Sequence, residues 1–503
     1  MKKLASLLLA LCVVLSFSSV LAEEKTVLEW FMYDHYSNEI WQADPIMQYA
    51  QDQTGIVVNV NSAPWGECDA KLNLMLANGE LPDVYMNFWY PWTENFSYLV
   101  EDGEIVEITD LLDNYPNLKA YVYGEESFRQ LFVIDEDGKE HIYGVPRYYP
   151  SCANYNIAIR TDLLKKYNLE IPTTWDELHD ALATICASED VAGLTFVGSS
   201  WLQALDAPWT NCNGYAKLDD GTWTYEEATE GYRAFLAYFA KWYEEGLIDP
   251  DMLLAQSSLH IEKMAAGKCV ASIQQWNPDF VSQYRQPLQE MGAEIALIPY
   301  LVGPEGTNDF GGTGAAVKAG SGSWLGWQLI NARTGNAEKV LEFYDFLLAN
   351  GGVLTRKGVE GVHYKVNPDG ATTWLDAYYA ELERPGSWSF KYDTTGPRFF
   401  IDYLNEEVGR LSPLCENADL INEGWARVLA AQLVRAPYTY QFNSENSINY
   451  SSAVSTVVSE WRDAFLTGKK STETDWDAYI AALNDAGASK IMADLTEWMA
   501  AHE

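Results

Sequence analysis

The stretch from Ile56 to Met86 reads IVVNVNSAPWGECDAKLNLMLANGELPDVYM, and its hydrophobic pattern changes period twice. Ile56–Val60 and Pro82–Met86 are short apolar runs typical of buried strands. Between them, Trp65–Ala77 carries apolar residues at helical spacing, and Asn78-Gly79 supplies the left-handed conformation that ends a helix. A strand, a helix and a strand in this order predict a βα unit of a largely parallel sheet.

The same alternation continues on both sides of this unit. Thr26–Met32 is an earlier strand pattern, and Thr174–Glu177 is a capping box that begins a helix. Phe132–Gly144 consists of two apolar runs around Asp-Gly, which predicts a hairpin. Later helices are expected at Asn336–Ala349, Trp476–Leu483 and Ile491–Met499. We predict an α/β protein with at least two lobes, because 503 residues exceed what one hydrophobic core organises.

The N-terminus has the three-part layout of a secretory signal peptide. Lys2 and Lys3 precede the apolar stretch Leu4–Leu15, and the small-residue site Val20-Leu21-Ala22 follows. The apolar stretch is shorter than the roughly 20 residues of a membrane-spanning helix. We predict that residues 1–22 direct export to the periplasm or the extracellular space. Cys12 follows Leu9-Ala10-Leu11, which has leucine where lipidation requires a small residue, so we expect a soluble protein without a lipid anchor.

Composition excludes some partners and favours others. The formal net charge of −39 repels phosphate backbones and anionic membrane surfaces, so nucleic acid is not an expected partner. The chain has 19 tryptophans and 31 tyrosines, which fits a surface that contacts flat, hydroxylated ligands. Packing in the hydrophobic cores accounts for most of these rings.

No motif for catalysis or for a cofactor is present. The chain contains no GxSxG, HExxH, P-loop or kinase signature, and Gly320–Gly326 misses the spacing of a dinucleotide-binding loop. Its six histidines are widely spaced, and its cysteines show no CxxC pair. We therefore expect no catalytic residues, no metal and no cofactor. A secreted glycan hydrolase or lyase stays the alternative, because glycoside hydrolysis needs only two carboxylates.

Several separated segments carry a family resemblance in their order and spacing. They are Lys71–Val84, Gly138–Pro146, Ile159–Tyr167, Pro172–Leu178, Met264–Lys268, Gly361–Tyr364, Leu466–Lys469 and Trp476–Tyr479. Together they resemble the family 1 extracellular solute-binding proteins, in the long oligosaccharide-binding branch that serves bacterial ABC importers. The resemblance spans almost the whole chain after the signal.

The resemblance implies a two-lobed, periplasmic-binding-protein-like (type II) fold with the ligand cleft between the lobes. It also implies a receptor, not an enzyme, that captures an oligosaccharide by hinge closure and delivers it to transmembrane permease subunits. We expect lobe 1 to contain residues 23–150, lobe 2 residues 151–310, a return to lobe 1 residues 311–400, and the rest of lobe 2 residues 401–503. The first crossing is expected near Tyr148–Asn156 and the second within Pro299–Trp327. We expect a monomer.

Ligand contacts are expected from side chains that follow strands, where α/β sheets place their ligands. The expected residues are Tyr33, Asp34, Trp89, Tyr90, Arg147, Tyr148, Trp201, Trp209, Trp276, Trp324, Trp327 and Tyr364. For each ring the alternative is core packing, and for Arg147 it is an ion pair at the hinge. Where several relatives carry a calcium loop, Ala187–Gly193 lacks the spaced oxygen ligands, so no calcium is expected there. A neutral oligosaccharide, a uronate-containing one and a peptide all stay open as ligands.

Overall fold

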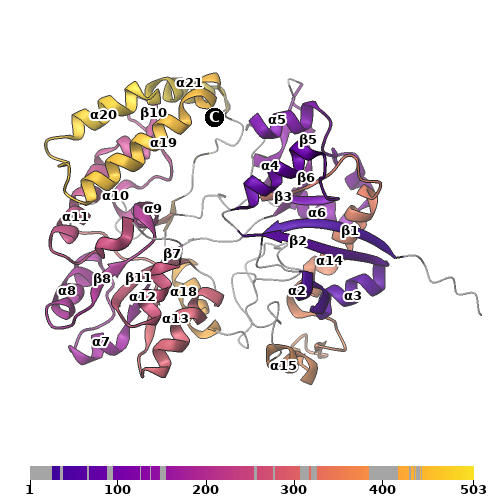
Figure 1. Cartoon of the computed structure of the whole chain (residues 1–503), viewed down its shortest axis with the longest axis horizontal. Coiled ribbons are helices and arrows are strands. Elements are labelled where there is room, and N and C mark those ends of the chain that lie inside the picture. The colour runs from indigo at the N-terminus through magenta and orange to yellow at the C-terminus, as the bar shows by residue number, and fades with distance from the viewer. Residues whose placement is uncertain are drawn as a thin grey trace, which may run out of the picture.

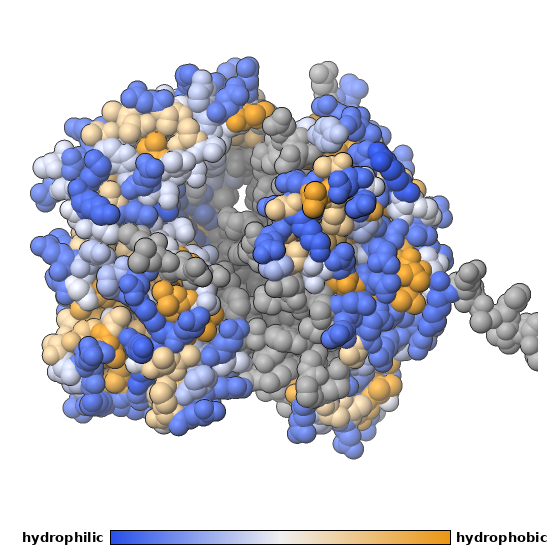
Figure 2. Space-filling view, in the orientation of Figure 1, coloured by the Kyte–Doolittle hydropathy of each residue, from blue (hydrophilic) through white to orange (hydrophobic). Residues whose placement is uncertain are grey.

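Two lobes lie side by side in the computed structural model (Figure 1). The structure describes residues 25–33, 38–64, 67–87, 94–124, 126–135, 137–147, 155–253, 258–275, 278–305, 316–318, 326–383, 417–429, 432–434, 437, 442 and 444–502. Within these ranges, no helix combines the length and the apolar character needed to cross a bilayer. Hydrophilic residues cover most of the described surface on the face that Figure 2 shows.

Lobe 1 is built on a five-stranded sheet in the order β2-β1-β3-β14-β6. The strands are β1 (Thr26–Tyr33), β2 (Ile56–Ala63), β3 (Val84–Asn87), β6 (Gly144–Arg147) and β14 (Gly326–Ile330). β1 runs parallel to β2 and to β3, whereas β14 runs antiparallel to β3 and to β6. The expected βα unit is thus confirmed at β2 and β3, with β1 lying between them.

The helices of lobe 1 bury apolar faces against this sheet. They are α2 (Asn38–Ala43), α3 (Pro45–Thr54), α4 (Cys68–Asn78), α5 (Glu94–Glu101), α6 (Pro116–Gly124) and α14 (Ala337–Lys357). Gly79 ends α4 in the left-handed conformation, as predicted. α14 is interrupted at Ala349–Gly352, where Asn350, Gly351 and Gly352 have φ of 56°, 70° and 70°. The expected helix from Asn336 to Ala349 is confirmed up to this break.

Smaller elements complete lobe 1. They are the 3₁₀ helices η2 (Leu111–Asn114) and η3 (Glu126–Leu131), the strands β4 (Val133–Ile134), β5 (Glu140–His141), β15 (Tyr364–Val366) and β16 (Thr372–Trp374), and the helix α15 (Asp376–Glu383). β4 and β5 pair antiparallel, which confirms the predicted hairpin.

Lobe 2 is built on a four-stranded sheet in the order β12-β7-β11-β8. The strands are β7 (Tyr155–Arg160), β8 (Ala192–Thr195), β11 (Cys269–Gln275) and β12 (Ile295–Ile298). β11 runs parallel to β8, but β7 runs antiparallel to both β11 and β12. β8, β11 and β12 therefore run in one direction, and β7 runs against them. The chain reaches β7 from lobe 1 and not from a helix of lobe 2. β7 therefore starts at the sheet edge where β11 and β12 end.

The remaining elements of lobe 2 cover the two faces of this sheet. They are α7 (Thr161–Lys166), α8 (Trp175–Cys186), α9 (Gly198–Gln203), α10 (Ala207–Thr210), β9 (Tyr215–Lys217), β10 (Trp223–Tyr225), η4 (Glu226–Ala228), α11 (Glu230–Glu244), η5 (Pro250–Leu253), α12 (Leu259–Ala265) and α13 (Pro278–Glu290). The predicted capping box at the start of α8 is confirmed. The Thr174 hydroxyl accepts from the Glu177 backbone N–H, and the Glu177 carboxylate accepts from the Thr174 backbone N–H.

The C-terminal helices also belong to lobe 2. They are α18 (Ala418–Leu429), α19 (Glu445–Leu466), α20 (Trp476–Asp485) and α21 (Ala488–His502). Trp476, Tyr479 and Leu495 join the same hydrophobic core as Trp175 and Phe239. α18 is tied to α13 by Arg285, which donates to both carboxylate oxygens of Asp419 at 3.0 and 2.9 Å. Figure 1 shows α19, α20 and α21 stacked at one end of this lobe.

One short strand lies between the two sheets in the chain. β13 (Ala316–Lys318) follows β12 of lobe 2 and precedes β14 of lobe 1, and it pairs parallel with β17 (Gln432–Val434). β13 contacts α10 and β17 stands between α18 and α19, so both short strands are attached to lobe 2. Lys318, the last residue of β13, is therefore attached to lobe 2.

Candidate functional site

Three strand ends meet at the edge of lobe 2 that faces lobe 1. β7 and β11 pair so that Tyr155 stands opposite Gln275, and β8 runs parallel to β11. The start of β7 and the ends of β8 and β11 therefore share one edge. Figure 1 shows β7 and α9 on the side of lobe 2 toward lobe 1. This is the kind of edge at which α/β sheets bind ligands.

Two amide side chains lie opposite each other at this edge. Asn156 on β7 and Gln274 on β11 are register partners, and both are fully buried. Gln274 donates to the Ser272 hydroxyl at 2.7 Å, but its Oε1 has no hydrogen-bond partner. Neither Oδ1 nor Nδ2 of Asn156 has one. Buried polar atoms without partners are rare in folded proteins, so these amides need an explanation beyond packing.

His260 on α12 adds two more unpaired polar atoms. The residue is buried, and neither ring nitrogen makes a hydrogen bond. Burial lowers the pKa of His260 to about 4. The imidazole is therefore neutral at neutral pH and offers one donor and one acceptor.

An aromatic ring completes the cluster. Trp201 on α9 is half-buried, and its ring meets His260 edge-on at a centroid distance of 4.9 Å. Tyr155 lies 5.0 Å from the same indole. Gly198, with φ of 65°, begins α9 three residues after the end of β8, so the chain turns there and places Trp201 at the sheet edge. Together, Tyr155, Asn156, Trp201, His260 and Gln274 form what we call the edge cluster.

The chemistry of the edge cluster suits a neutral, hydroxylated ligand. Aromatic rings bind the C–H faces of such a molecule, and fixed amide and imidazole groups bind its hydroxyls. Elsewhere in the described parts of the chain, no group of three His, Cys, Asp or Glu side chains is arranged to hold a metal ion. Glu189, in the stretch expected to bind no calcium, accepts a hydrogen bond from Tyr167 at 2.6 Å and pairs with Lys166.

A corresponding edge exists on lobe 1. β1 ends at Tyr33, β3 at Asn87 and β6 at Arg147, and the start of β14 lies opposite the last two. These four ends meet at one edge. The chain leaves lobe 1 after Arg147 and re-enters a sheet at Tyr155, so the edges of the two lobes are joined by a short connection.

Four of the predicted ligand residues have side chains whose surroundings the structure describes. Trp201 belongs to the edge cluster. Trp209 is only 2% exposed and packs between Phe235 and Phe239, while Trp327 is 0% exposed and stacks on Phe96 at 4.7 Å. The ring of Tyr364 is also buried, against Trp374.

For the other predicted residues the structure gives less. Tyr33 and Arg147 are placed as the last residues of β1 and β6, at the lobe-1 edge. The remainder lie outside the described residues: Asp34, Trp89, Tyr90, Tyr148, Trp276 and Trp324.

Sequence reasoning missed four members of the edge cluster: Tyr155, Asn156, His260 and Gln274. Asn156 interrupts the apolar strand YNIAIR, and Gln274 belongs to the polar end of CVASIQQ. A polar residue inside a buried strand is a signal that was available in the sequence. His260 sits on a short helix, and only its surroundings distinguish it from a surface histidine.

The chain is similar to known proteins over most of its length. A family model described as bacterial extracellular solute-binding protein matches residues 37–353. Lipoprotein LipO of Bacillus subtilis is 23% identical over 90% of this chain and 88% of its own length. The polygalacturonan/rhamnogalacturonan-binding protein YtcQ of the same species is 22% identical over 69% of this chain and 68% of its own.

Solved structures share the fold. The S. pneumoniae ABC-transporter substrate binding protein FusA, in complex with kestose, superposes with a TM-score of 0.68 at 19% identity, covering 95% of this chain and 99% of its own. The alginate-binding protein AlgQ2 without calcium ion gives a TM-score of 0.65 at 18% identity, with 95% and 99% covered. Because the family model covers more than half of the sequence, the chain belongs to the bacterial extracellular solute-binding protein family.

Proposed function

We propose that this protein is a receptor that captures an oligosaccharide between its two lobes and delivers it to the transmembrane permease subunits of an ABC transporter. The observation that carries the proposal is the edge cluster. The Asn156 amide, Gln274 Oε1 and the His260 ring nitrogens have no hydrogen-bond partner and lie beside the half-buried Trp201. These are the groups that a sugar needs, at the edge that faces the other lobe. Closure traps the ligand because only the closed form contacts it from both sides.

Relatives support carbohydrate as the ligand class. YtcQ is named for binding polygalacturonan and rhamnogalacturonan, and FusA is named as a fructooligosaccharide substrate-binding protein. Polygalacturonan is acidic and fructooligosaccharides are neutral, so the names support a glycan as the ligand but do not indicate its charge. The edge cluster itself offers neutral donors and acceptors.

The proposed ligand surface joins the edge cluster to the predicted residues at the strand ends. From the prediction it keeps Trp201, with Tyr33, Asp34, Trp89, Tyr90, Arg147, Tyr148, Trp276 and Trp324. Trp209, Trp327 and Tyr364 are left out of this surface because their rings pack in the lobe interiors.

A secreted hydrolase or lyase would bind the same glycans but convert them. We therefore test the purified protein against kestose, maltotriose, xylotriose and trigalacturonate, by calorimetry for binding and by chromatography for products. One molecule of an unchanged trisaccharide bound per chain is the expected result. Release of shorter sugars without stoichiometric retention would contradict the receptor function.

Export and processing are part of the same proposal. Residues 1–22 are proposed to be removed after Ala22, leaving a monomer without a lipid anchor outside the cytoplasm. LipO is named as a lipoprotein, so the anchor needs its own test. Mass spectrometry of the mature protein is expected to find Glu23 as the first residue, and a diacylglyceryl group on Cys12 would show the opposite.

A further inference from the structure

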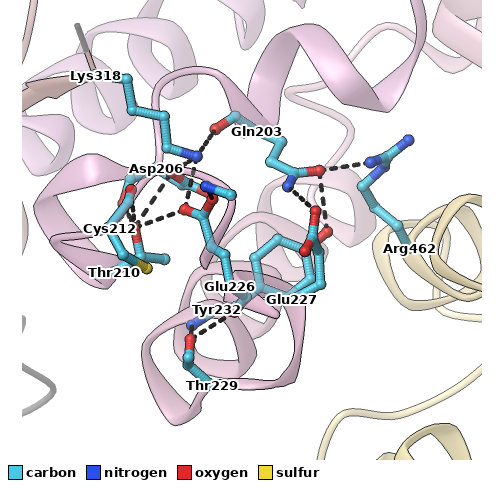
Figure 3. A network of polar contacts seen from close by, with 11 residues as sticks. Gln203, Asp206, Thr210, Cys212, Glu226, Glu227, Thr229, Tyr232, Lys318 and Arg462 are labelled. Atoms are coloured by element: carbon cyan, nitrogen blue, oxygen red, sulfur yellow. Dashed lines mark hydrogen bonds and ion pairs between the residues drawn. The ribbon is translucent and has the colours of Figure 1, made fainter. Parts of the chain in front are cut away.

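A buried lysine attaches β13 to the body of lobe 2. The Lys318 ammonium lies 2.6 Å from Asp206 Oδ1 and 2.6 Å from Glu226 Oε1 (Figure 3). The lysine side chain is 11% exposed, and the two carboxylates are buried completely. Asp206 stands just before α10 and Glu226 begins η4, so one cation joins three parts of the chain.

Further hydrogen bonds fix this ion pair. Glu226 Oε1 accepts from the Thr210 hydroxyl at 2.9 Å, and Oε2 accepts from the Gly214 backbone at 2.8 Å. Burial lowers the pKa of Lys318, but Asp206 and Glu226 outweigh it and raise that pKa overall. The ammonium is therefore charged at neutral pH, and its geometry is over-determined.

The same ammonium is linked to the helix that carries Trp201. It donates to the Gln203 carbonyl at 3.4 Å, and Gln203 stands two residues after Trp201 on α9. The Gln203 side chain donates to Glu227 at 2.8 Å and accepts from Arg462 of α19 at 2.5 Å (Figure 3). α9 is thus held between the crossing strand β13 on one side and α19 on the other.

The position of Lys318 in the chain gives this attachment its importance. It is the last described residue fixed to lobe 2 before the chain enters the lobe-1 sheet at Gly326. Eight peptide steps separate the two residues, which span at most about 29 Å. Any change in the relation of the lobes acts on the chain that follows Lys318.

We propose that Lys318 is a positioning residue that fixes strand β13 to helix α9 as one rigid unit. A ligand that contacts Trp201 on α9 then acts, through β13, on the chain that connects the two lobes. This inference rests on the proposed function, because it assumes that ligand binds at the edge cluster. It adds a coupling between that contact and closure. Coupling of this kind requires a packed element that contacts both sites. The ion pairs and hydrogen bonds of Lys318 join β13 and α9 into such an element.

The test compares Lys318→Met with a matched control in the same lobe. Lys263 on α12 also binds two carboxylates, with Nζ 2.6 Å from Asp249 and 2.8 Å from Asp251, and it is 17% exposed. Both of its partners lie in lobe 2, and none of the three residues is on a segment between the lobes. Lys263→Met therefore removes an equivalent ion pair without touching β13.

The readouts are the dissociation constant and the ligand-induced decrease in radius of gyration from small-angle X-ray scattering, with the trisaccharide that binds wild type. We expect Lys318→Met to lose most of the decrease and to bind about tenfold more weakly. Lys263→Met is expected to keep both within about twofold, since the ion pair it loses is not part of the coupling. Lys318→Met protein that contracts fully and binds with wild-type affinity would overturn the inference.

A second variant covers the risk that unpaired buried carboxylates prevent folding. Lys318→Met/Asp206→Asn/Glu226→Gln removes both charges together with the lysine, and it is expected to fold and to show the same loss of contraction. Full contraction in this variant overturns the inference. The proposed function fails separately and visibly, if wild type binds none of the four trisaccharides.

Discussion

Trp201 and Trp209 stand eight residues apart, and the same argument from the sequence proposed both as ligand contacts. The structure separates them by their surroundings. Trp209 lies among Phe235, Tyr238 and Phe239, whereas Trp201 stays half-buried beside His260. Nothing in the local sequence distinguishes the two rings, because both follow β8 in short helices.

Replacing each ring separates a ligand contact from a core residue. Trp201→Ala is expected to weaken trisaccharide binding at least tenfold, since one stacking face is lost, with a change in unfolding free energy below about 1.5 kcal/mol. Trp209→Ala is expected to lower the unfolding free energy by about 3 to 5 kcal/mol. Calorimetry and urea unfolding of both variants measure this. Equal binding by Trp201→Ala and wild type would remove Trp201 from the ligand surface.

Asp206, one of the two acidic partners of Lys318, yields a pH-dependent prediction. Burial and then the neighbouring Glu226 raise the pKa of Asp206, against the pull of Lys318. A carboxyl group whose pKa is higher in the folded than in the unfolded protein stabilises the fold at pH values below its unfolded-state pKa. This stabilisation is lost as pH rises through its folded-state pKa. Asp206→Asn still accepts a hydrogen bond from Lys318 and cannot lose a proton. Its unfolding free energy relative to wild type is therefore expected to increase between pH 4 and pH 7.5.

Urea unfolding of wild type and Asp206→Asn at four pH values checks this. A relative stability of Asp206→Asn that falls as pH rises would mean that pairing with Lys318 outweighs burial and lowers the pKa of Asp206.

Residue identity alone predicted part of the candidate site. Trp201 was predicted, because aromatic residues after strands follow a general rule. Asn156, Gln274 and His260 were missed, because their unpaired atoms depend on which neighbours surround them in three dimensions. Unpaired buried groups are a property of the folded environment.

At the scale of elements, local signals were sufficient for most helices. The Thr174–Glu177 capping box was predicted from four letters, and both of its hydrogen bonds are present. Strand direction was less predictable. β7 and β14 enter their sheets from the other lobe, and such an entry follows from the path of the whole chain.

The cap of α8 provides a measurable case. Thr174→Ala removes the acceptor for the Glu177 backbone N–H, which lies 3.0 Å from the hydroxyl, and is expected to cost about 1 kcal/mol of unfolding free energy. Thr184, exposed in the same helix, bonds only to the Asp180 carbonyl, so Thr184→Ala is expected to be neutral or slightly stabilising. The cap explanation fails if both variants unfold at the same urea concentration.

Close packing of α11 on α10 gives another prediction. A Cβ on Gly231 would lie 2.5 Å from the Trp209 carbonyl oxygen, which is backbone and cannot move aside. Gly231→Ala is expected to cost about 1 to 3 kcal/mol of unfolding free energy. Gly124, at the end of α6, has open space around it, so Gly124→Ala is expected to change stability by less than about 1 kcal/mol. Thermal unfolding of the two variants decides the matter, and an unaffected Gly231→Ala would contradict this packing.

At the scale of the whole molecule, the sequence predicted two lobes from length and from ordered motifs. It did not predict that β13 would pair with β17, from residues more than a hundred positions further along the chain. Nor did it predict that Lys318 would bind Asp206 and Glu226 in the interior of lobe 2. Contacts at such separation follow from the completed packing of α10, η4 and β13, for which local sequence carries no signal.

The central claim is that two lobes close over a glycan that the protein holds and does not convert. Small-angle X-ray scattering of wild type, with and without a saturating trisaccharide that calorimetry shows to bind, tests it most directly. We predict a smaller radius of gyration in the presence of the sugar, with the sugar recovered intact after the measurement. A bound sugar with an unchanged radius of gyration, or a sugar recovered as shorter products, would contradict the account.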